Sequence, residues 1–156
     1  MKKILVVIVT LALILAASCE QKADIEAEKT QVKALLDSYV ASVEAEDINL
    51  YGQSVAHDPA MVNFGAFGDP IVGWDALKKV IEDQNVALSE TKITATDLEI
   101  HVSEKGKLAW VTCQWKLEAM MGENRIDLPV RCTWVLEKRD NRWVIVHFHK
   151  SMPAAG

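Results

Sequence analysis

Two histidines near the end of the chain are its clearest candidates for acid–base chemistry. His147 and His149 are two residues apart in a segment whose pattern predicts a strand, so both side chains lie on one face. The ordinary pKa of histidine is close to neutral, which suits a general acid or base. As zinc ligands the pair lacks an obvious third partner, because His57 and His101 are far away in sequence. We expect no metal and no other cofactor.

The length of the turn before this strand decides which face the two histidines occupy. A four-residue turn places them with Cys132 and Trp134 on the apolar side of the sheet. A three-residue turn places them on the opposite side, with Arg131 and Thr133. In that second case the residues that join the apolar side are Val144, Val146 and Phe148. Because a shift of one residue moves every side chain across a sheet, both arrangements remain open.

A second pair of reactive side chains lies in a predicted hairpin. Residues 108–121 and 125–138 align their apolar faces without adjustment if Gly122 and Glu123 form a two-residue turn. Cys113 then faces Cys132, and opposed residues of this kind have α-carbons about 5.5 Å apart, within the range of a disulfide. The same register opposes Val111 with Trp134, Trp115 with Val130, and Leu117 with Leu128. The two cysteines form either a cross-strand disulfide or a pair of buried thiols.

The elements that position these residues follow from the spacing of apolar residues. Helical spacing predicts three helices, over residues 24–46, 47–55 and 75–88, with a short strand at 61–66. Beyond the third helix the alternation becomes that of strands, and it slips at Asp97, which predicts a β-bulge. Helices followed by a long antiparallel meander indicate an α+β domain with the helices on one face of the sheet.

The start of the chain resembles the signal of a bacterial lipoprotein. Lys2 and Lys3 precede a short apolar core at residues 4–15, and small residues at 16–18 precede Cys19. This core is shorter than the roughly 20 apolar residues that a membrane-spanning helix needs. We expect cleavage before Cys19 and a lipid anchor on its thiol, which would hold the protein to a bacterial membrane of the cell envelope, outside the cytoplasm. The alternative is an ordinary cleaved signal.

Charge and length limit the possible partners and the number of domains of the remaining chain. The net charge of −5 becomes −7 when Lys2 and Lys3 are removed with the signal. An acidic balance without a basic cluster argues against a nucleic-acid partner. The expected organisation is a signal peptide, a lipidated tether with the helix start, one domain and a tail, at residues 1–18, 19–27, 28–152 and 153–156.

The closing segment, Arg142 to Ser151, resembles the final strand of the association domain of calcium/calmodulin-dependent protein kinase II and of SnoaL-like domains. Both belong to the nuclear transport factor 2-like superfamily. Further features agree with that family: the acidic break at 44–50, the strand entry at 58–61, Gly73-Trp74, and the pair Arg131 and Thr133. The resemblance covers nearly all of residues 28–152. It implies a cone-like, curved antiparallel sheet wrapped around three N-terminal helices, with a pocket at the open end.

The resemblance also suggests a role for Tyr39. Ketosteroid isomerase, in the same superfamily, uses a tyrosine on the first helix as an oxyanion donor, and Tyr39-Val40-Ala41 looks like its surroundings. The position of the isomerase's aspartate base falls near Asn63 or Phe64, neither of which takes up a proton. Steroid isomerase chemistry of that type is therefore not expected.

Three functions follow from this reading. The first is binding of a small, largely apolar molecule in the cone pocket, since aromatic side chains fall on its candidate inner face. The second is a homo-oligomeric assembly module, for which we expect a homodimer. The third is an isomerase or dehydratase that uses Tyr39 and either His147 or His149. The pocket candidates are Tyr39, Trp74, Trp115, Arg131, Trp134, His147 and His149.

Overall fold

The computed structural model of the protein describes residues 22–153, so Cys19 and the signal segment lie outside the described residues. Its helices α2, α3 and α4 span Ile25–Glu44, Ile48–Ser54 and Trp74–Ala87. Two short antiparallel strands are β1 and β2, at Val62–Asn63 and Ile71–Val72. The main antiparallel sheet has the order β3-β4-β5-β6, at Ser89–Val102, Leu108–Met121, Asn124–Arg139 and Arg142–Ser151. This order confirms the predicted α+β fold class.

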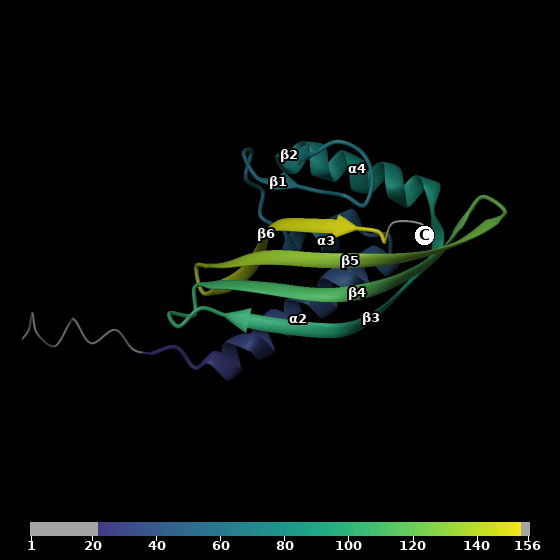
Figure 1. Cartoon of the computed structure of the whole chain (residues 1–156). Helices are drawn as coiled ribbons and strands as arrows, with labels where there is room; N and C mark the ends of the chain where they lie inside the picture. Colours follow the sequence, from purple (N-terminus) through teal and green to yellow (C-terminus); the bar gives the residue numbers. More distant parts are fainter. Residues whose placement is uncertain (1–21, 154–156) are drawn as a thin grey trace, which may run out of the picture.

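The curved sheet and the helices enclose the core between them. Figure 1 shows α2 and α3 behind the sheet, with α4 and the β1–β2 pair beyond its β6 edge. Parallel bridges from Val55 to Ile145 and from Phe64 to His149 attach this region to β6. The segment between α3 and α4 is therefore fixed to the β6 edge of the sheet. From there α4 lies against the inner side of the strands.

Helix α2 is the main support of the sheet. The Asp24 side chain accepts a hydrogen bond from the Ala27 N–H at 3.1 Å and caps the first turn. The buried apolar residues of the helix recur at intervals of three or four and form one stripe: Val32, Leu36, Tyr39 and Val43. Within residues 22–153, no helix combines the length and the apolar composition needed to cross a bilayer.

The pairing of β4 with β5 follows the predicted register. Cys113 lies opposite Cys132, and Gly122 and Glu123 are the two residues between the strands. The bulge predicted at Asp97 is also present, because the β3–β4 register shifts there and Asp97 has a φ of 53°. The sequence pattern therefore predicted both the hairpin and the irregularity in its neighbour.

The turn between β5 and β6 is shorter than either alternative considered for it. Only Asp140 and Asn141 connect the two strands, and both have positive φ, as in the two-residue turns that match strand twist. Farther along, Val135 pairs with His147 while Leu136 pairs with Ile145. One residue of β6 is left over between these pairs, which makes a β-bulge.

This bulge changes which residues of β6 face the core. The inward-facing residues are Trp143, Ile145, Phe148 and Lys150, which lie opposite the inward-facing residues of β5. His147 and His149 lie on the other face, as the three-residue turn predicted and the four-residue turn did not. The three-residue turn also predicted that Val144 and Val146 face the apolar side, and this was wrong. The shorter turn and the bulge place Ile145 there instead.

A partly buried ion pair connects the start of α2 to the far end of the sheet. Glu28 accepts hydrogen bonds from Lys138 Nζ at 2.6 and 2.7 Å, and from Trp143 Nε1 at 2.8 Å. The side chains of Glu28 and Lys138 are only 13% and 12% exposed. Burial raises the pKa of the Glu28 carboxyl, but the two hydrogen-bond donors and the Lys138 charge outweigh it, so the pKa lies below its ordinary value.

We expect Glu28→Gln to lower the free energy of unfolding by about 2 kcal/mol near neutral pH, because it removes a charged acceptor from Lys138 and Trp143. Since the native pKa of Glu28 is lowered, its contribution is complete above the ordinary value of 4.5 and is lost as the pH falls through the native pKa. Urea unfolding of wild type and variant should therefore differ most near neutral pH and converge in acid.

Glu26→Gln is the matched control for this measurement. Glu26 lies on the same helix and pairs with Lys29, but its side chain is 81% exposed. An exposed pair of this kind contributes no more than about 1 kcal/mol. An equal loss of stability in both variants, or no loss in Glu28→Gln, would show that the contact does not hold α2 to the sheet.

Candidate functional site

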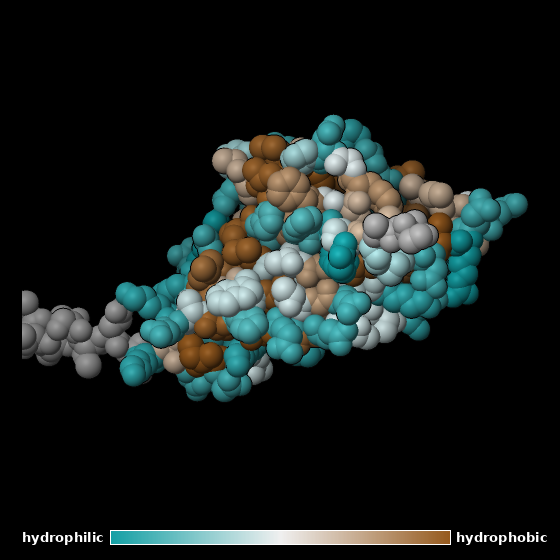
Figure 2. Space-filling view, in the orientation of Figure 1, coloured by the Kyte–Doolittle hydropathy of each residue, from teal (hydrophilic) through white to brown (hydrophobic). Residues whose placement is uncertain are grey.

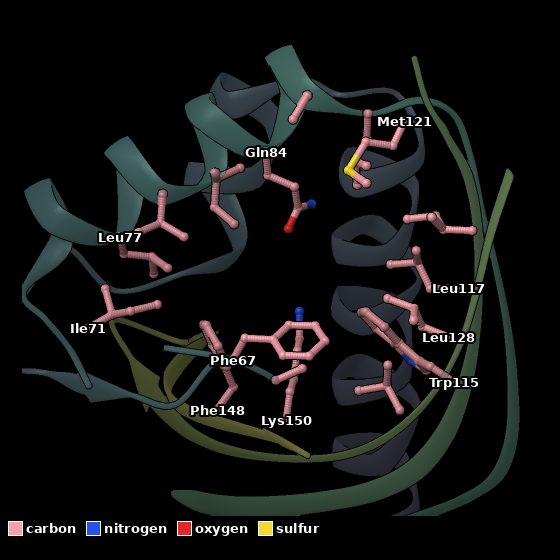
Figure 3. A pocket seen from close by; sticks show the side chains of 18 residues that line it. Phe67, Ile71, Leu77, Gln84, Trp115, Leu117, Met121, Leu128, Phe148 and Lys150 are labelled. Carbon is pink, nitrogen blue, oxygen red and sulfur yellow. The ribbon is translucent and has the colours of Figure 1, made fainter. Parts of the chain in front are cut away.

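A cavity of about 520 Å³ lies between α4 and the inner face of the sheet (Figure 3). Among the described residues that line it, only Gln84 and Lys150 carry an amide or charged side-chain group. The apolar wall from α4 and the residues next to it consists of Gly65, Ala66, Phe67, Ile71, Leu77, Val80, Ile81, Ala87 and Leu88. The wall from the sheet consists of Trp115, Leu117, Met121, Ile126, Leu128, Val130 and Phe148. The site is thus an apolar space with one cation and one amide.

The strand register explains the apolar wall on the sheet side. Trp115 pairs with Val130 and Leu117 pairs with Leu128, so these side chains lie together on the inner face of β4 and β5. The rim of the cavity is apolar as well, because Phe67, Val80 and Met121 line it while they are 66%, 42% and 50% exposed. An apolar molecule would meet apolar side chains from the opening inward.

Lys150 is the only cationic residue that lines the cavity in the described part of the chain. Its Nζ lies 4.7 Å from the ring centroid of Trp115, 5.0 Å from that of Phe148 and 5.7 Å from that of Tyr39. These ring faces attract the ammonium group. Among the ion pairs between residues 22–153, none involves Lys150. The charge is therefore held by aromatic rings and not by a carboxylate.

Of the aromatic pocket candidates, Trp115 lines the cavity, and Tyr39 and Trp134 lie buried behind it. The Trp115 ring centroid is 6.1 Å from that of Tyr39 and 5.4 Å from that of Trp134. The Tyr39 hydroxyl is 3.3 Å from the Tyr51 hydroxyl, and both tyrosines are fully buried. Burial raises the pKa of Tyr51 well above its ordinary value. Tyr39 thus uses its hydroxyl within the core, away from the cavity.

Trp74 and Arg131, two further pocket candidates, lie apart from the cavity. Trp74 stacks on the His57 ring, with a centroid distance of 4.0 Å and an angle of 12° between the rings, beside a separate hollow of about 160 Å³. Arg131 is on the outer face of the sheet, where its guanidinium donates a hydrogen bond to the Met152 carbonyl at 2.8 Å. Neither residue belongs to the cavity lining.

His147 and His149 also lie on the outer face, so the sheet separates them from the cavity. His147 Nδ1 is 2.6 Å from the carbonyl oxygen of Val62, to which it donates. The Phe64 ring meets the rings of both histidines, at centroid distances of 5.8 and 5.5 Å. Both side chains therefore pack against the segment around β1, and neither reaches a molecule bound inside the cone.

Asn63 stands where the resemblance suggested an isomerase would carry its base. Its side chain is fully buried, and its Oδ1 accepts a hydrogen bond from the backbone N–H of Phe148 at 2.9 Å. The residue connects β1 to β6 and has no proton to exchange with a substrate. Asn63 therefore serves as a buried contact between these two strands and not as a proton acceptor.

Cys113 and Cys132 are opposed, buried and present as free thiols. The pKa of Cys132 is raised, because its S–H bonds to Cys113 and because it is buried. The pKa of Cys113 is lowered, chiefly because that same hydrogen bond stabilises its thiolate. The cross-strand disulfide remains a prediction, since the register permits either redox state.

The match to known families decides the identity of the domain. A model of the SnoaL-like domain matches residues 32–155. The chain belongs to the SnoaL-like domain family. No curated protein matches this SnoaL-like chain.

Solved structures agree with this SnoaL-like assignment. A nuclear transport factor 2-like superfamily protein from Salmonella enterica serovar Typhimurium has a TM-score of 0.76 and 22% identity, covering 83% of this chain and 94% of that one. A candidate calcium/calmodulin-dependent protein kinase II association domain from Xanthomonas campestris scores 0.71 at 19% identity, covering 86% and 96%. A ketosteroid isomerase-like protein from Erwinia carotovora atroseptica scores 0.69 at 15%, covering 82% and 98%. These similarities confirm the fold.

Sequence reasoning did not select Lys150 and Gln84, the two polar residues of this SnoaL-like cavity. A signal for Lys150 was available, because alternation from an inward-facing Phe148 places Lys150 on the same face. Gln84 had no comparable signal, since which face of α4 meets the cavity depends on how the helix docks against the sheet. The chemical content of the pocket thus became visible only in the folded chain.

Proposed function

We propose that this SnoaL-like domain binds a small, largely apolar molecule in the cavity between α4 and the sheet. The observation that carries the proposal is the cavity itself, about 520 Å³ with an apolar wall and an apolar rim. Its volume lies within the range of roughly 300–1,000 Å³ that is typical of small-molecule sites. Apolar walls of this extent present surface that a ligand would remove from water.

The positions of the candidate acid–base residues favour binding over catalysis. An isomerase or dehydratase would need a titrating group against its substrate, whereas His147 and His149 lie on the outer face and Tyr39 is bonded to Tyr51. The family includes isomerase and dehydratase members, but a shared fold does not carry over their chemistry. The polar groups that a ligand would contact in the cavity are the Lys150 ammonium and the Gln84 amide.

The membrane anchor is part of the same proposal. The support is the arrangement of Lys2, Lys3, the apolar core, the small residues and Cys19. Acyl chains on Cys19 would hold the domain at a bacterial membrane in the cell envelope, facing outside the cytoplasm, without any protein contact to lipid. A pocket tethered in this way would meet ligands at or near the membrane surface.

A second candidate function is assembly of a homodimer through the outer face of the sheet. Trp110, Val135 and His147 are in register across β4, β5 and β6 and form one row on that face. Trp110 is 44% exposed, and its ring stacks on that of His101 at 5.0 Å. Figure 2 shows this face as a mixture of polar and apolar side chains, and such a surface suits a partner chain.

The binding proposal predicts that filling the cavity will displace an apolar probe. Leu128→Trp adds volume to the cavity wall on β5, so N-phenyl-1-naphthylamine, a neutral fluorescent probe, should bind at least about tenfold more weakly than to wild type. A fluorescence titration measures the dissociation constant. Thr133→Trp is the matched control, because Thr133 lies on the same strand and on the outer face. Equal binding by wild type and Leu128→Trp, with both folded by thermal melting, would refute the proposed site.

The anchor proposal predicts the cellular fraction of the protein. Wild type produced in a bacterium should sediment with membranes and enter the detergent phase, and Cys19→Ser should lose both properties because it lacks the acylated thiol. Cys113→Ser is the control, since Cys113 is buried in the domain. If Cys19→Ser stays in the membrane fraction after a high-salt wash, the anchor is not on Cys19.

The assembly proposal predicts a dimer that a charge on the outer face weakens. Light scattering of wild type should give the mass of two chains at micromolar concentration, and Trp110→Glu should give the mass of one, because a carboxylate in an apolar interface is left unpaired. Val86→Glu is the control, since Val86 is 89% exposed on α4. A monomeric wild type would exclude this second function.

A further inference from the structure

We infer that the ligand of the cavity is an amphipathic monocarboxylate, held with its carboxylate on Lys150 and its apolar body toward the rim. The inference rests on the proposed binding function and names the class of molecule that the site selects. It is carried by one contrast within the cavity: sixteen lining residues are apolar and one, Lys150, is a cation without a carboxylate partner in residues 22–153.

The ammonium group of Lys150 lacks an anionic partner. Its Nζ is surrounded by the rings of Trp115, Phe148 and Tyr39, at 4.7, 5.0 and 5.7 Å. Ring faces return only part of the hydration that a cation loses in apolar surroundings. They also accept no conventional hydrogen bond from its three N–H donors, and a ligand carboxylate would supply a charged acceptor for them.

Gln84 provides a second contact for the same head group. Figure 3 shows its amide, from α4, and the Lys150 ammonium, from β6, pointing toward each other across the cavity. An amide N–H and an ammonium N–H that converge on one space can donate to the two oxygens of a single carboxylate. The head group therefore lies between the helix and the sheet.

The charge count selects a monoanion. One ammonium and one neutral amide balance a single negative charge, whereas a dianionic head group would leave one buried charge unpaired. Within residues 22–153 the cavity lining contains no Glu or Asp, so no carboxylate of the described chain competes for Lys150 there. A cationic head group would be repelled by Lys150, and a neutral one would leave its charge without a partner.

The exposure of the lining residues sets the direction of the ligand. The rings that hold Nζ are buried, with Tyr39, Trp115 and Phe148 exposed by no more than 3%. The most exposed apolar residues of the lining, Phe67, Val80 and Met121, form its rim. A carboxylate on Lys150 would thus lie at the inner end, and an alkyl or aromatic body would extend along the apolar walls to the opening.

The test compares three probes that share one alkyl chain and differ in charge. Isothermal titration calorimetry is made on the full chain with Cys19→Ser in every protein compared, so that no acyl anchor is present, in detergent-free buffer near neutral pH. It should show that decanoate binds roughly 10- to 100-fold more tightly than decan-1-ol, as expected for a charge-assisted hydrogen bond. Decyltrimethylammonium should bind more weakly than the alcohol. In Lys150→Met the preference for decanoate should disappear while decan-1-ol binds at least as tightly as before.

Lys33→Met is the matched control, because Lys33 is an exposed residue of α2 that pairs with Asp37. It should keep the preference of wild type, and thermal melting should show that both variants are folded. Equal affinities of decanoate and decan-1-ol for wild type, or a preference that survives in Lys150→Met, would overturn the inference and leave the apolar binding site in place. If neither these probes nor N-phenyl-1-naphthylamine bind, the proposed function fails as well.

Discussion

The antiparallel pairing of β4 with β5 is the constraint on which the placement of every functional side chain depends. Alternation along the two strands turns Trp115 and Val130 inward and leaves Trp110 and Thr133 outside. A shift of one residue would exchange the two faces and would place the apolar wall of the cavity in water. The two-residue turn at Gly122 and Glu123 excludes that shift, because its geometry sets the register of the strands that it joins.

The bulge in β6 is the second feature that determines which side chains face the cavity. It lets Ile145 and Phe148 both face inward although they are three residues apart, and the residue after next, Lys150, follows them into the cavity. Without it, the alternation that turns Ile145 inward would continue to His147 and His149, and Phe148 and Lys150 would face outward. An irregularity of one residue thus separates the chemistry of the inside, a lysine among aromatic rings, from that of the outside, a pair of histidines beside Phe64.

A cation inside an apolar cavity carries a free-energy cost that the fold does not remove by itself. Elsewhere the protein satisfies its buried charges internally, as Lys138 does with Glu28. Lys150 differs because its ammonium group lies over ring faces and, within residues 22–153, pairs with no carboxylate. The contrast between the two lysines distinguishes a structural ion pair from a cation that a molecule in the cavity could contact.

The sequence by itself determined the class of fold, the β4–β5 register and the bulge at Asp97, because these depend on local spacing and on short turns. It left open the face of His147 and His149, since a turn length and a bulge of one residue decide that together. The composition of the pocket was decided only by tertiary structure. Gln84 and Lys150 are 66 positions apart in the sequence, and they line one cavity because α4 docks over the sheet, an arrangement that no local pattern encodes.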